Sequence, residues 1–299
     1  MTDRPFRCGF IAVAGRPNVG KSTLVNALVG HKVSIVSPRP QTTRQRILGI
    51  LDTEAAQLVF VDTPGIHAGG KRALNRRMNR AASSAVTDAD LVLLVLEAMV
   101  WREQDEWVLR QCVQSGRPLG VVINKLDTLT ASTQLLPYLD HLRDKAAFQF
   151  MVPVSARKQD NLRELVRVVT QALPESPALF PVGQVTDQSD AARAAELIRE
   201  QMMRALQQEL PYSAAVQIEE FAQQEKLLRI GATLWVEREG QKAIVIGKGG
   251  AMLKQIGHDA RMELQKLFGK KVYLRLWVKV RENWADSEPA LRQLGIEDR

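Results

Sequence analysis

Three short motifs in the first half of the chain combine residues that could bind a nucleotide. Gly15–Ser22 fits the pattern G-x-x-x-x-G-K-[ST], directly after an apolar run and before a helical stretch. The glycines of such a loop let backbone N–H groups wrap phosphate oxygens, and the helix N-terminus adds a favourable dipole. We expect Lys21 to reach the β- and γ-phosphates and the Ser22 hydroxyl to bind Mg²⁺. The expected loop contacts are Gly15, Arg16, Pro17, Asn18, Val19, Gly20, Lys21, Ser22 and Thr23.

The second motif, Asp62–Gly65, reads D-T-P-G and follows the apolar run Leu58–Val61. Alone, such a sequence is usually a turn, but its place ~40 residues after the phosphate loop makes it specific. Asp62 would hold Mg²⁺ through water, and the Gly65 N–H would bind the γ-phosphate. The expected nucleotide contacts here are Asp62, Thr63, Pro64, Gly65 and Ile66.

The third motif, Asn124–Asp127, follows the buried run Val121–Ile123. The Asp127 carboxylate can accept hydrogen bonds from guanine N1–H and the N2 amine, whereas adenine lacks the N2 donor and would leave the carboxylate underpaired. Asn124 would brace the loop, and the stem of Lys125 would pack on the base. After the last apolar run, a backbone N–H at Ser155 or Ala156 would read guanine O6.

The elements that must hold these motifs form an alternating pattern of apolar runs and helical stretches. Short runs rich in Val, Leu and Ile indicate parallel strands buried on both faces. Segments long enough for crossover helices separate them, which is the pattern of a doubly wound α/β sheet. Ile47–Leu51 directly precedes the second run and predicts one antiparallel edge strand. The five runs are Phe10–Ala14, Leu58–Val61, Leu91–Leu96, Val121–Ile123 and Val152–Val154.

A proline-rich segment, Pro174–Gly183, interrupts this pattern and predicts an extended linker. We therefore divide the chain into a nucleotide-binding domain at 1–175, a linker at 176–189 and a small α+β domain at 190–299. The second domain is expected to contain strands at 228–236, 243–246 and 272–280, with a further candidate at Val216–Phe221. Helices are expected at 194–205 and 252–268, and the element order is α-β-β-α-α-β.

The segment Val245–Gly250 of this second domain matches the G-x-x-G loop of KH domains, which clamps the backbone of single-stranded nucleic acid. The element order fits the prokaryotic (type II) KH arrangement. Ile246 and Leu253 would line an apolar groove for bases. A small α+β interaction module is the alternative. The expected RNA contacts are Ile246, Gly247, Lys248, Gly249, Gly250, Leu253 and Lys254.

The last strand carries basic and aromatic residues on one face. They could form a second nucleic-acid surface, or Trp277 could pack on a neighbouring helix. The residues are Tyr273, Arg275, Trp277, Lys279 and Arg281.

Composition narrows the class of protein. The chain has 299 residues, of which 45% are hydrophobic, enough for substantial cores. Cys8 and Cys112 indicate reduced cytosolic thiols rather than a disulfide framework. The N-terminus lacks the apolar stretch of a secretory signal, and the longest apolar run is too short to span a membrane. We expect a cytoplasmic monomer.

The formal net charge is +8, which favours nucleic acid or anionic lipid as a partner. The stretch from Lys242 to Arg281 contains seven Lys and three Arg but only two acidic residues, Asp259 and Glu263. The stretch Lys71–Arg80 holds five bases and no acid. A charge run can also be only a solvated face.

Together the nucleotide motifs resemble the translation-factor-related GTPases, in particular the subgroup with G-R-P-N-V-G-K-S and a T-T-R switch, here Gln41–Arg44. The resemblance implies that one threonine binds Mg²⁺ in the GTP state, and it favours Thr43 over Thr42. Ile66 stands where Ras-like GTPases carry a water-orienting Gln. We therefore expect slow hydrolysis, stimulated by a partner or by K⁺, which Asn18 would coordinate. Asn18 could equally be a loop-bracing residue.

Over nearly its whole length, the chain resembles the Era family of bacterial GTPases. The resemblance implies catalysis centred on Lys21, Thr43 and Gly65, with Ser22, Thr43 and Asp62 holding Mg²⁺. It implies binding to the 3′ end of small-subunit (16S) ribosomal RNA and a role in 30S subunit maturation. Some members of the family associate peripherally with the inner membrane.

Two other functions compete with this interpretation. A membrane-surface signalling GTPase would use the basic stretches to bind anionic lipid. A metabolic P-loop kinase would bind a small acceptor, but the Asn124–Asp127 motif and the absence of a substrate-sized insertion argue against it.

Overall fold

The computed structural model describes residues 5–37, 39, 42–65, 72–129, 135–206, 214–294 and 296. The chain forms two compact units. The first comprises Met1–Lys71, Asn75–Asp187 and Asp298–Arg299, and the second comprises Arg72–Leu74 and Gln188–Glu297.

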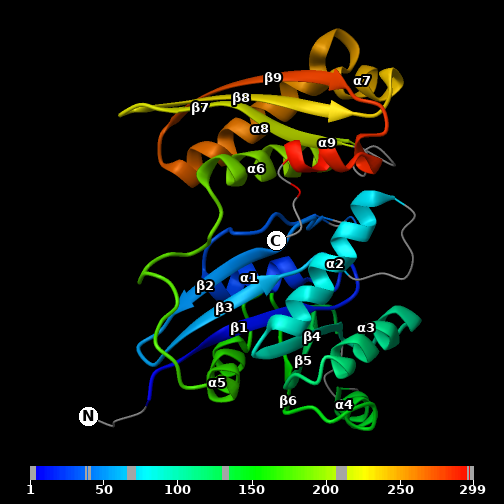
Figure 1. Ribbon diagram of the computed structural model, residues 1–299, viewed down its shortest axis with the longest axis vertical. Helices are drawn as coiled ribbons and strands as arrows, with labels where there is room; N and C mark the ends of the chain where they lie inside the picture. The colour runs from blue at the N-terminus through cyan, green and yellow to red at the C-terminus, as the bar shows by residue number, and fades with distance from the viewer. Residues whose placement is uncertain are drawn as a thin grey trace. The chain divides into compact units, whose positions relative to one another are not determined.

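The first unit is built on a six-stranded sheet in the order β2-β3-β1-β4-β5-β6 (Figure 1). Strands β1, β3, β4, β5 and β6 are parallel, and β2 pairs antiparallel with β3 at one edge. The mostly parallel sheet and its antiparallel edge strand confirm the sequence prediction. The strands are β1 Arg7–Ala14, β2 Ile47–Asp52, β3 Ala56–Asp62, β4 Leu91–Glu97, β5 Leu119–Asn124 and β6 Phe150–Pro153.

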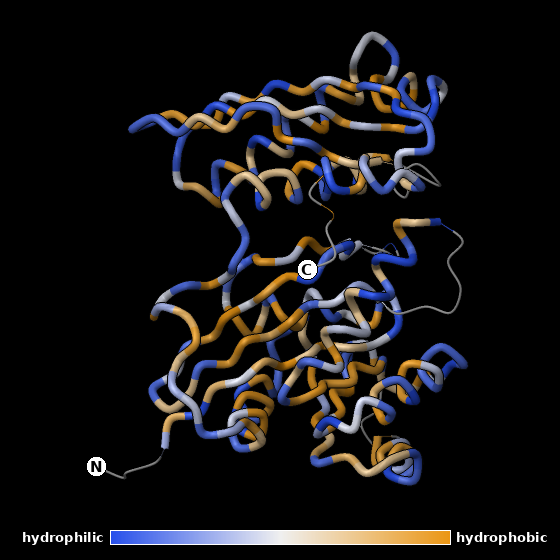
Figure 2. The backbone as a smooth tube through the Cα atoms, viewed as in Figure 1, coloured by the Kyte–Doolittle hydropathy of each residue, from blue (hydrophilic) through white to orange (hydrophobic). Residues whose placement is uncertain are grey.

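Helices cover both faces of this sheet, because the side chains of each strand alternate between the two faces. On one face, Ile11 of β1 shares a core with Leu24 of α1 and with α5. On the other, Ala12 of β1 shares a core with Val108 of α3 and with α2 and α4. Figure 2 shows the resulting hydrophobic residues along the central strands. The helices are α1 Lys21–Val29, α2 Ala73–Asp88, α3 Glu103–Gln114, α4 Leu135–Arg143 and α5 Leu162–Ala172, with a 3₁₀ turn at Leu126–Thr128.

The proline-rich segment after α5 runs along the β2 and β3 edge of the first sheet. Buried Gln57 of β3 accepts from the backbone N–H groups of Leu179 and Phe180 at 2.8 and 2.9 Å, and its amide donates to the Phe180 carbonyl. The Ile50 N–H donates to the Val185 carbonyl at 3.0 Å. These bonds attach the segment to the sheet as far as Val185, two residues before this part of the first unit ends at Asp187.

The second unit is a three-stranded sheet in the order β7-β8-β9, in which β7 and β8 are antiparallel and β8 and β9 parallel. Helices α6 and α8 share one core with this sheet. The order from α6 to β9 is α-β-β-α-α-β. This is the predicted string of elements, but its first strand is β7, which contains the candidate strand Val216–Phe221, and its second is β8 rather than the run at 243–246. The elements are α6 Asp190–Ala205, β7 Ala215–Gln223, β8 Leu227–Val236, α7 Glu239–Ile246, α8 Ala251–Phe268, β9 Lys271–Val280 and α9 Glu288–Gln293, with 3₁₀ turns at Lys248–Gly250 and Trp284–Asp286.

One predicted strand is wrong, because residues 243–246 form the last turn of helix α7. A four-residue apolar run fits either a strand or a buried helical turn. Polar residues outside the run decide between them. The Gln241 side chain accepts from the N–H groups of Glu237 and Arg238 at 2.8 and 3.2 Å, which caps the helix start, and Gly247 at φ 74° ends the helix.

No helix in the described ranges is both long and apolar enough to cross a membrane.

Candidate functional site

The loop between β1 and α1, Gly15–Gly20, is where the sequence predicts a phosphate cradle. Its glycines are required by space as well as by backbone angle. A Cβ on Gly15 (φ 155°) would lie 2.6 Å from the Val95 carbonyl oxygen, and one on Gly20 (φ 98°) would lie 2.4 Å from Asn124 Nδ2. No side chain caps the N-terminus of α1. Its first N–H groups are therefore available to an anion.

Lys21 lies inside this loop with its ammonium group held by backbone carbonyls. Its Nζ donates to the Gly15 and Arg16 carbonyls at 2.9 and 3.1 Å, and the side chain is buried. Burial lowers the pKa of Lys21 to about 8, although the nearby Asp62 opposes this shift. A phosphate group in the loop would supply the negative charge that this buried ammonium needs.

Two hydroxyls and one carboxylate meet beside the loop, from α1, the segment before β2, and the end of β3. Ser22 Oγ donates to Asp62 Oδ2 at 2.8 Å and lies 2.9 Å from Thr43 Oγ1. The Thr43 hydroxyl lies 3.3 Å from the same carboxylate oxygen. Within the described ranges, Asp62 Oδ1 is buried and has no hydrogen-bond partner. Burial raises the pKa of Asp62, while Lys21 and the hydroxyls of Ser22, Ser34 and Thr43 lower it.

This oxygen cluster fits a divalent cation such as Mg²⁺, which prefers hydroxyl, carboxylate and water ligands. The unpaired Asp62 oxygen is the polar atom that a metal-bound water would satisfy. Thr42 points elsewhere, because its hydroxyl donates to the Arg39 carbonyl at 2.7 Å. Of the two threonines, Thr43 is therefore the one whose hydroxyl lies beside Ser22 and Asp62.

The D-T-P-G segment brings Gly65 against the phosphate loop. A Cβ on Gly65 would lie 2.9 Å from Pro17 Cγ, so a side chain at this position would displace the loop. Thr63 is buried and donates its hydroxyl to the Val13 carbonyl at 2.9 Å, so its side chain braces the strand end. Pro64 is also buried. Ile66 lies outside the described residues.

A pocket gathers most of the predicted phosphate-site residues. The sequence did not identify the Ile35–Ser37 part of its wall, which carries no motif. The lining residues are Pro17, Asn18, Gly20, Lys21, Ser22, Thr23, Ile35, Val36, Ser37, Arg39, Thr42, Thr43 and Gly65.

The guanine motif lies at the end of β5, and Asn124 ties it to two other loops. Its amide donates to the Val19 carbonyl of the phosphate loop at 2.9 Å, and its Oδ1 accepts from the Ala156 N–H at 3.0 Å. Ser155 Oγ donates to Asp127 Oδ1 at 2.6 Å, and this bond lowers the pKa of Asp127. The predicted bracing role of Asn124 thus has a direct geometric basis, and Asp127 is held ionised as an acceptor.

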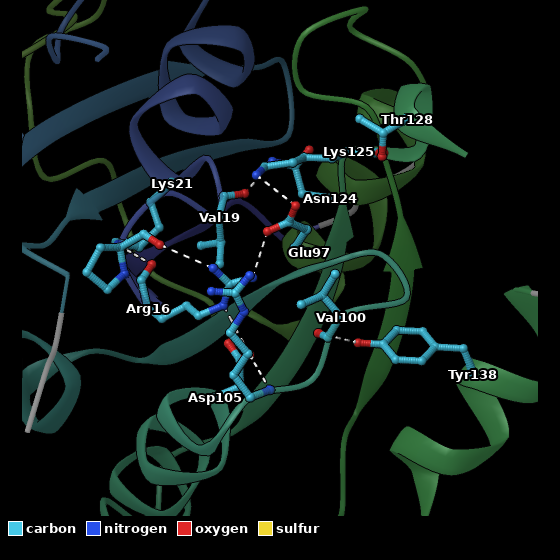
Figure 3. Close-up of polar contacts among 12 residues, drawn as sticks. Arg16, Val19, Lys21, Glu97, Val100, Asp105, Asn124, Lys125, Thr128 and Tyr138 are labelled. Carbon is cyan, nitrogen blue, oxygen red and sulfur yellow. Dashed lines mark hydrogen bonds and ion pairs between the residues drawn. The ribbon is translucent and has the colours of Figure 1, made fainter. Parts of the chain in front are cut away.

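A partly buried ionic network links the phosphate loop to the guanine motif (Figure 3). Glu97, at the end of β4, accepts from Arg16 Nη2 at 2.6 Å and from Lys125 Nζ at 3.1 Å. Arg16 Nε also donates to the fully buried Asp105 of α3 at 3.1 Å. Burial alone would raise the pKa of Glu97, but the bonds from Arg16 and Lys125 outweigh it, and the net shift is downward.

The sequence did not identify Glu97 or Asp105 as site residues. One sequence feature could have identified Glu97. This residue follows an apolar run that predicts a buried parallel strand, and ligands bind at the carboxyl ends of such strands. Asp105 lies in the first turn of α3, where it also accepts from the Arg102 N–H at 3.0 Å, and its link to the site depends on the position of Arg16.

In the second unit, the glycine-rich loop joins α7 to α8. Gly247 has φ 74°, and a Cβ there would lie 2.7 Å from the Met252 Cβ, so only glycine fits. Gly249 and Gly250 also have positive φ, but a Cβ at either would meet nothing within 4 Å. The loop therefore has an open outer side, over which an extended backbone could pass closely.

A groove of about 520 Å³ opens beside this loop, between α8 and β9. The predicted Leu253 and Lys254 line it, whereas Ile246 is not among its lining residues. The sequence did not identify Gly257 or Arg261, which continue the groove along α8. A glycine inside a helix costs about 1 kcal/mol of stability relative to alanine, so Gly257 within the predicted helix was a sequence feature that could have pointed to this groove. The full lining is Gly250, Leu253, Lys254, Gly257, His258, Arg261, Val272, Tyr273, Leu274 and Leu276.

Two family models match the chain. Residues 10–125 match a model described as 50S ribosome-binding GTPase, and residues 209–285 match the KH domain model. GTPase Era of Stenotrophomonas maltophilia (strain K279a) is 53% identical over 293 residues, which cover 98% of each chain. GTPase Era of Coxiella burnetii (strain Dugway 5J108-111) is 50% identical over 295 residues, covering 99% of this chain and 100% of the relative.

Solved structures agree with these matches. A crystal structure of an Aquifex aeolicus Era variant bound to GDP.AlF4- is 40% identical, with a TM-score of 0.94, and covers 97% of this chain and 99% of its own. A crystal structure of Era in complex with MgGDPNP and nucleotides 1506–1542 of 16S ribosomal RNA gives the same identity, TM-score and coverage. These matches confirm the predicted fold class, a doubly wound P-loop domain followed by a KH domain.

Proposed function

Because the chain belongs to the Era family of GTPases, we propose that it is a GTP-driven switch whose output is binding of the 3′ end of 16S ribosomal RNA. The chain is a GTPase, and it hydrolyses GTP to GDP and phosphate. Through this binding it would assist maturation of the 30S subunit. The main supporting observation is that one chain combines a guanine-nucleotide site with a glycine-rich loop beside an apolar groove that is flanked by basic side chains.

The nucleotide site assigns a task to each side chain. Asp127, held ionised by Ser155, accepts from the guanine N1–H and N2 amine, which selects guanine over adenine. The Lys21 ammonium neutralises charge on the β- and γ-phosphates. Gly65, pressed against Pro17, presents its N–H to the γ-phosphate.

The metal that we propose for this site is Mg²⁺. Ser22 and Thr43 would hold it directly, and Asp62 would hold it through water. When bound, Mg²⁺ offsets the negative charge that develops on the β- and γ-phosphate oxygens.

RNA would bind through the groove beside the glycine loop. Leu253, Leu274 and Leu276 offer apolar surface to splayed bases, and Lys254 and Arg261 offer charge to phosphates. The proposal is supported by a structural relative, 40% identical over 97% of this chain, that was solved with a 16S ribosomal RNA segment.

We propose slow intrinsic hydrolysis that K⁺ accelerates. Ile66 cannot orient water as a glutamine does, so another group must stabilise the transition-state charge. Asn18 is exposed, lines the phosphate pocket, and has φ 66°. Replacing it with glycine keeps this backbone angle accessible and removes the side chain.

The K⁺ proposal is tested by the GTP hydrolysis rate in KCl and in NaCl at equal ionic strength. The native chain should hydrolyse faster in KCl, and Asn18→Gly should lose this difference. Equal native rates in the two salts would contradict the role of K⁺.

The RNA proposal is tested with the full-length chain, a GTP analogue and a labelled oligonucleotide that matches the 3′ tail of 16S ribosomal RNA. Gly249→Asp places a negative charge on the open side of the loop, where the structure leaves space. The matched control is Gly116→Asp, since Gly116 has a similar φ of 66° and equally open surroundings at the end of α3. Aspartate is among the residues that tolerate this backbone region.

We expect the native chain to prefer this RNA over a scrambled sequence. Gly249→Asp should abolish the binding, and Gly116→Asp should retain it. A native chain without sequence preference would contradict the proposal.

We further propose a cytoplasmic monomer with peripheral membrane contact. Binding to vesicles of anionic lipid, measured with the same variants, tests that contact.

A further inference from the structure

The sheet of the second unit has one face that the helices of the described ranges leave uncovered. Even-numbered residues of β8 and β9 join the core shared with α6 and α8, and odd-numbered residues point the other way. In a sheet with one solvated face, that face is normally polar. Here it carries three large aromatic rings among basic side chains. We define this aromatic face by Arg229, Trp235, Tyr273, Arg275, Trp277, Lys279 and Arg281.

Two rings of this aromatic face are exposed and the third, Trp235, is half-buried, and all three lie beside cations. Tyr273 and Trp277 keep 51% and 43% of their surface accessible. The Arg275 guanidinium lies 5.9 Å from the Tyr273 ring centroid and 5.4 Å from that of Trp277. Lys279 Nζ and the Arg281 guanidinium lie 5.8 and 6.0 Å from the centroid of the Trp235 ring.

Trp277 lies over the neighbouring strand. A Cβ on Gly231 of β8 would come within 3.2 Å of the Trp277 ring, so the missing side chain leaves room for the ring at this point of the sheet. The sequence left open whether Trp277 packs on a helix. The structure answers this, because the ring lies on the uncovered face of the strands.

Charge on the aromatic face suits a polyanion. The strand registers place Glu220 of β7 opposite Gly231, and Glu220 pairs with Arg275 at 2.8 Å. Arg229, Lys279 and Arg281 add further positive charge around the three rings. Exposed aromatic rings interleaved with basic side chains are the arrangement that binds single-stranded nucleic acid by stacking bases and neutralising phosphates.

The aromatic face is also continuous with the groove beside the glycine loop. Tyr273 belongs to both, because it lines the groove and the guanidinium groups of Arg229 and Arg275 lie beside its ring. A strand leaving the groove over the edge strand β9 would meet Tyr273 first and Trp277 next. These two residues are about 13 Å apart along the strand, so each ring can stack on a base of its own.

We propose that the aromatic face is a second RNA platform, on which unpaired nucleotides flanking the groove-bound segment stack on Tyr273 and Trp277. The inference rests on the proposed function, since it requires that RNA occupy the groove. It adds a second binding surface outside the groove.

The test compares two labelled RNAs on the full-length chain with a GTP analogue. The short RNA contains only the segment that matches the 3′ tail, and the long RNA continues into an unpaired pyrimidine extension. Trp277→Leu removes the aromatic ring and keeps an apolar side chain, while Trp277→Tyr keeps a ring. Lys266→Gln is the charge control for Lys279→Gln, because Lys266 is exposed on α8, which packs on the opposite face.

The long RNA should bind the native chain about tenfold more tightly than the short RNA. Tyr273 lines the groove and is within reach of both RNAs, so the gain comes mainly from the one base stacked on Trp277. Trp277→Leu and Lys279→Gln should remove most of that gain, whereas Trp277→Tyr and Lys266→Gln should keep it. None of these substitutions should change the affinity for the short RNA. Stacking should also quench the fluorescence of the native chain more than that of Trp277→Leu.

A long-RNA gain that survives Trp277→Leu would overturn the platform. So would a Trp277-dependent association with anionic vesicles or a protein while the two RNAs bind equally. A failure of the proposed function gives a different result. In that case the native chain would bind the short RNA no more tightly than a scrambled sequence.

Discussion

Arg16 occupies a variable position of the phosphate-loop pattern, yet its neighbours hold it in one place. Its guanidinium bonds Glu97 and Asp105, and Glu97 also accepts from Lys125 of the guanine motif. The two ends of the nucleotide site are thus positioned by one carboxylate. Arg16 and Asp105 are buried and Glu97 is partly buried, so removing one of these charges leaves the others uncompensated away from water.

Replacing Glu97 with Gln should weaken GDP binding about tenfold, because two charge-assisted hydrogen bonds lose their charged acceptor. A titration with fluorescent GDP measures the effect. Glu164→Gln is the control, since Glu164 forms a similar bond to Arg167 at 2.8 Å on the exposed side of α5. Equal GDP affinity in the native chain and the Glu97 variant would show that the network does not position the base site.

Replacing Gly257 with Leu should block the groove. The helix passes close to β9 here, since a Cβ on Gly257 would lie 3.5 Å from Leu276 Cδ1, and a longer side chain would fill the space proposed for bases. RNA affinity should fall more than tenfold while GTP hydrolysis without RNA stays unchanged. Gly240→Leu is the control, because Gly240 of α7 has open surroundings. Undiminished RNA affinity in the Gly257 variant would move the RNA site elsewhere.

The strands and most helices follow from local sequence, whereas several contacts between them do not. Parallel strands buried on both faces must be continuously apolar, so the runs such as Leu91–Leu96 and their sheet could be predicted. Residues 243–246 could not, because a four-residue run is ambiguous and the cap at Gln241 decides it. The roles of Glu97 and Gln57 depend on partners far away in the chain, and no spacing rule identifies such partners.

Gln57 shows how one side chain fixes a whole segment. It is fully buried in β3, and its amide group satisfies the backbone N–H groups of Leu179 and Phe180 and the Phe180 carbonyl. The segment after α5 therefore depends on a side chain more than 120 residues earlier.

Gln57→Leu should lower the free energy of unfolding by about 2–4 kcal/mol, because two backbone N–H groups lose their acceptor. Urea unfolding followed by circular dichroism measures the change. Limited proteolysis should cut between Ser176 and Thr186 faster in this variant. The control is Gln114→Leu on the exposed end of α3. If the midpoint and the cleavage rate match those of the native chain, the segment is held by other contacts.

The chain joins a GTPase to a KH domain, and its proposed behaviour as a switch requires that each site influence the other. A coupling between two binding sites is reciprocal, so a nucleotide that favours RNA binding must itself bind more tightly when RNA is present. The residues that we propose to sense the γ-phosphate are Thr43, through the metal, and Gly65, through its N–H. They come from two different segments of the first unit. Part of the first segment, at residues 38, 40 and 41, lies outside the described residues.

The most direct test measures the affinity of the full-length chain for the 3′-tail RNA with GDP and with a non-hydrolysable GTP analogue. We expect at least tenfold tighter binding with the analogue, about 1.4 kcal/mol of coupling. The same ratio should appear when nucleotide affinity is measured with and without RNA. Equal RNA affinity in the two nucleotide states would contradict the switch and leave a GTPase and an RNA-binding domain that act independently.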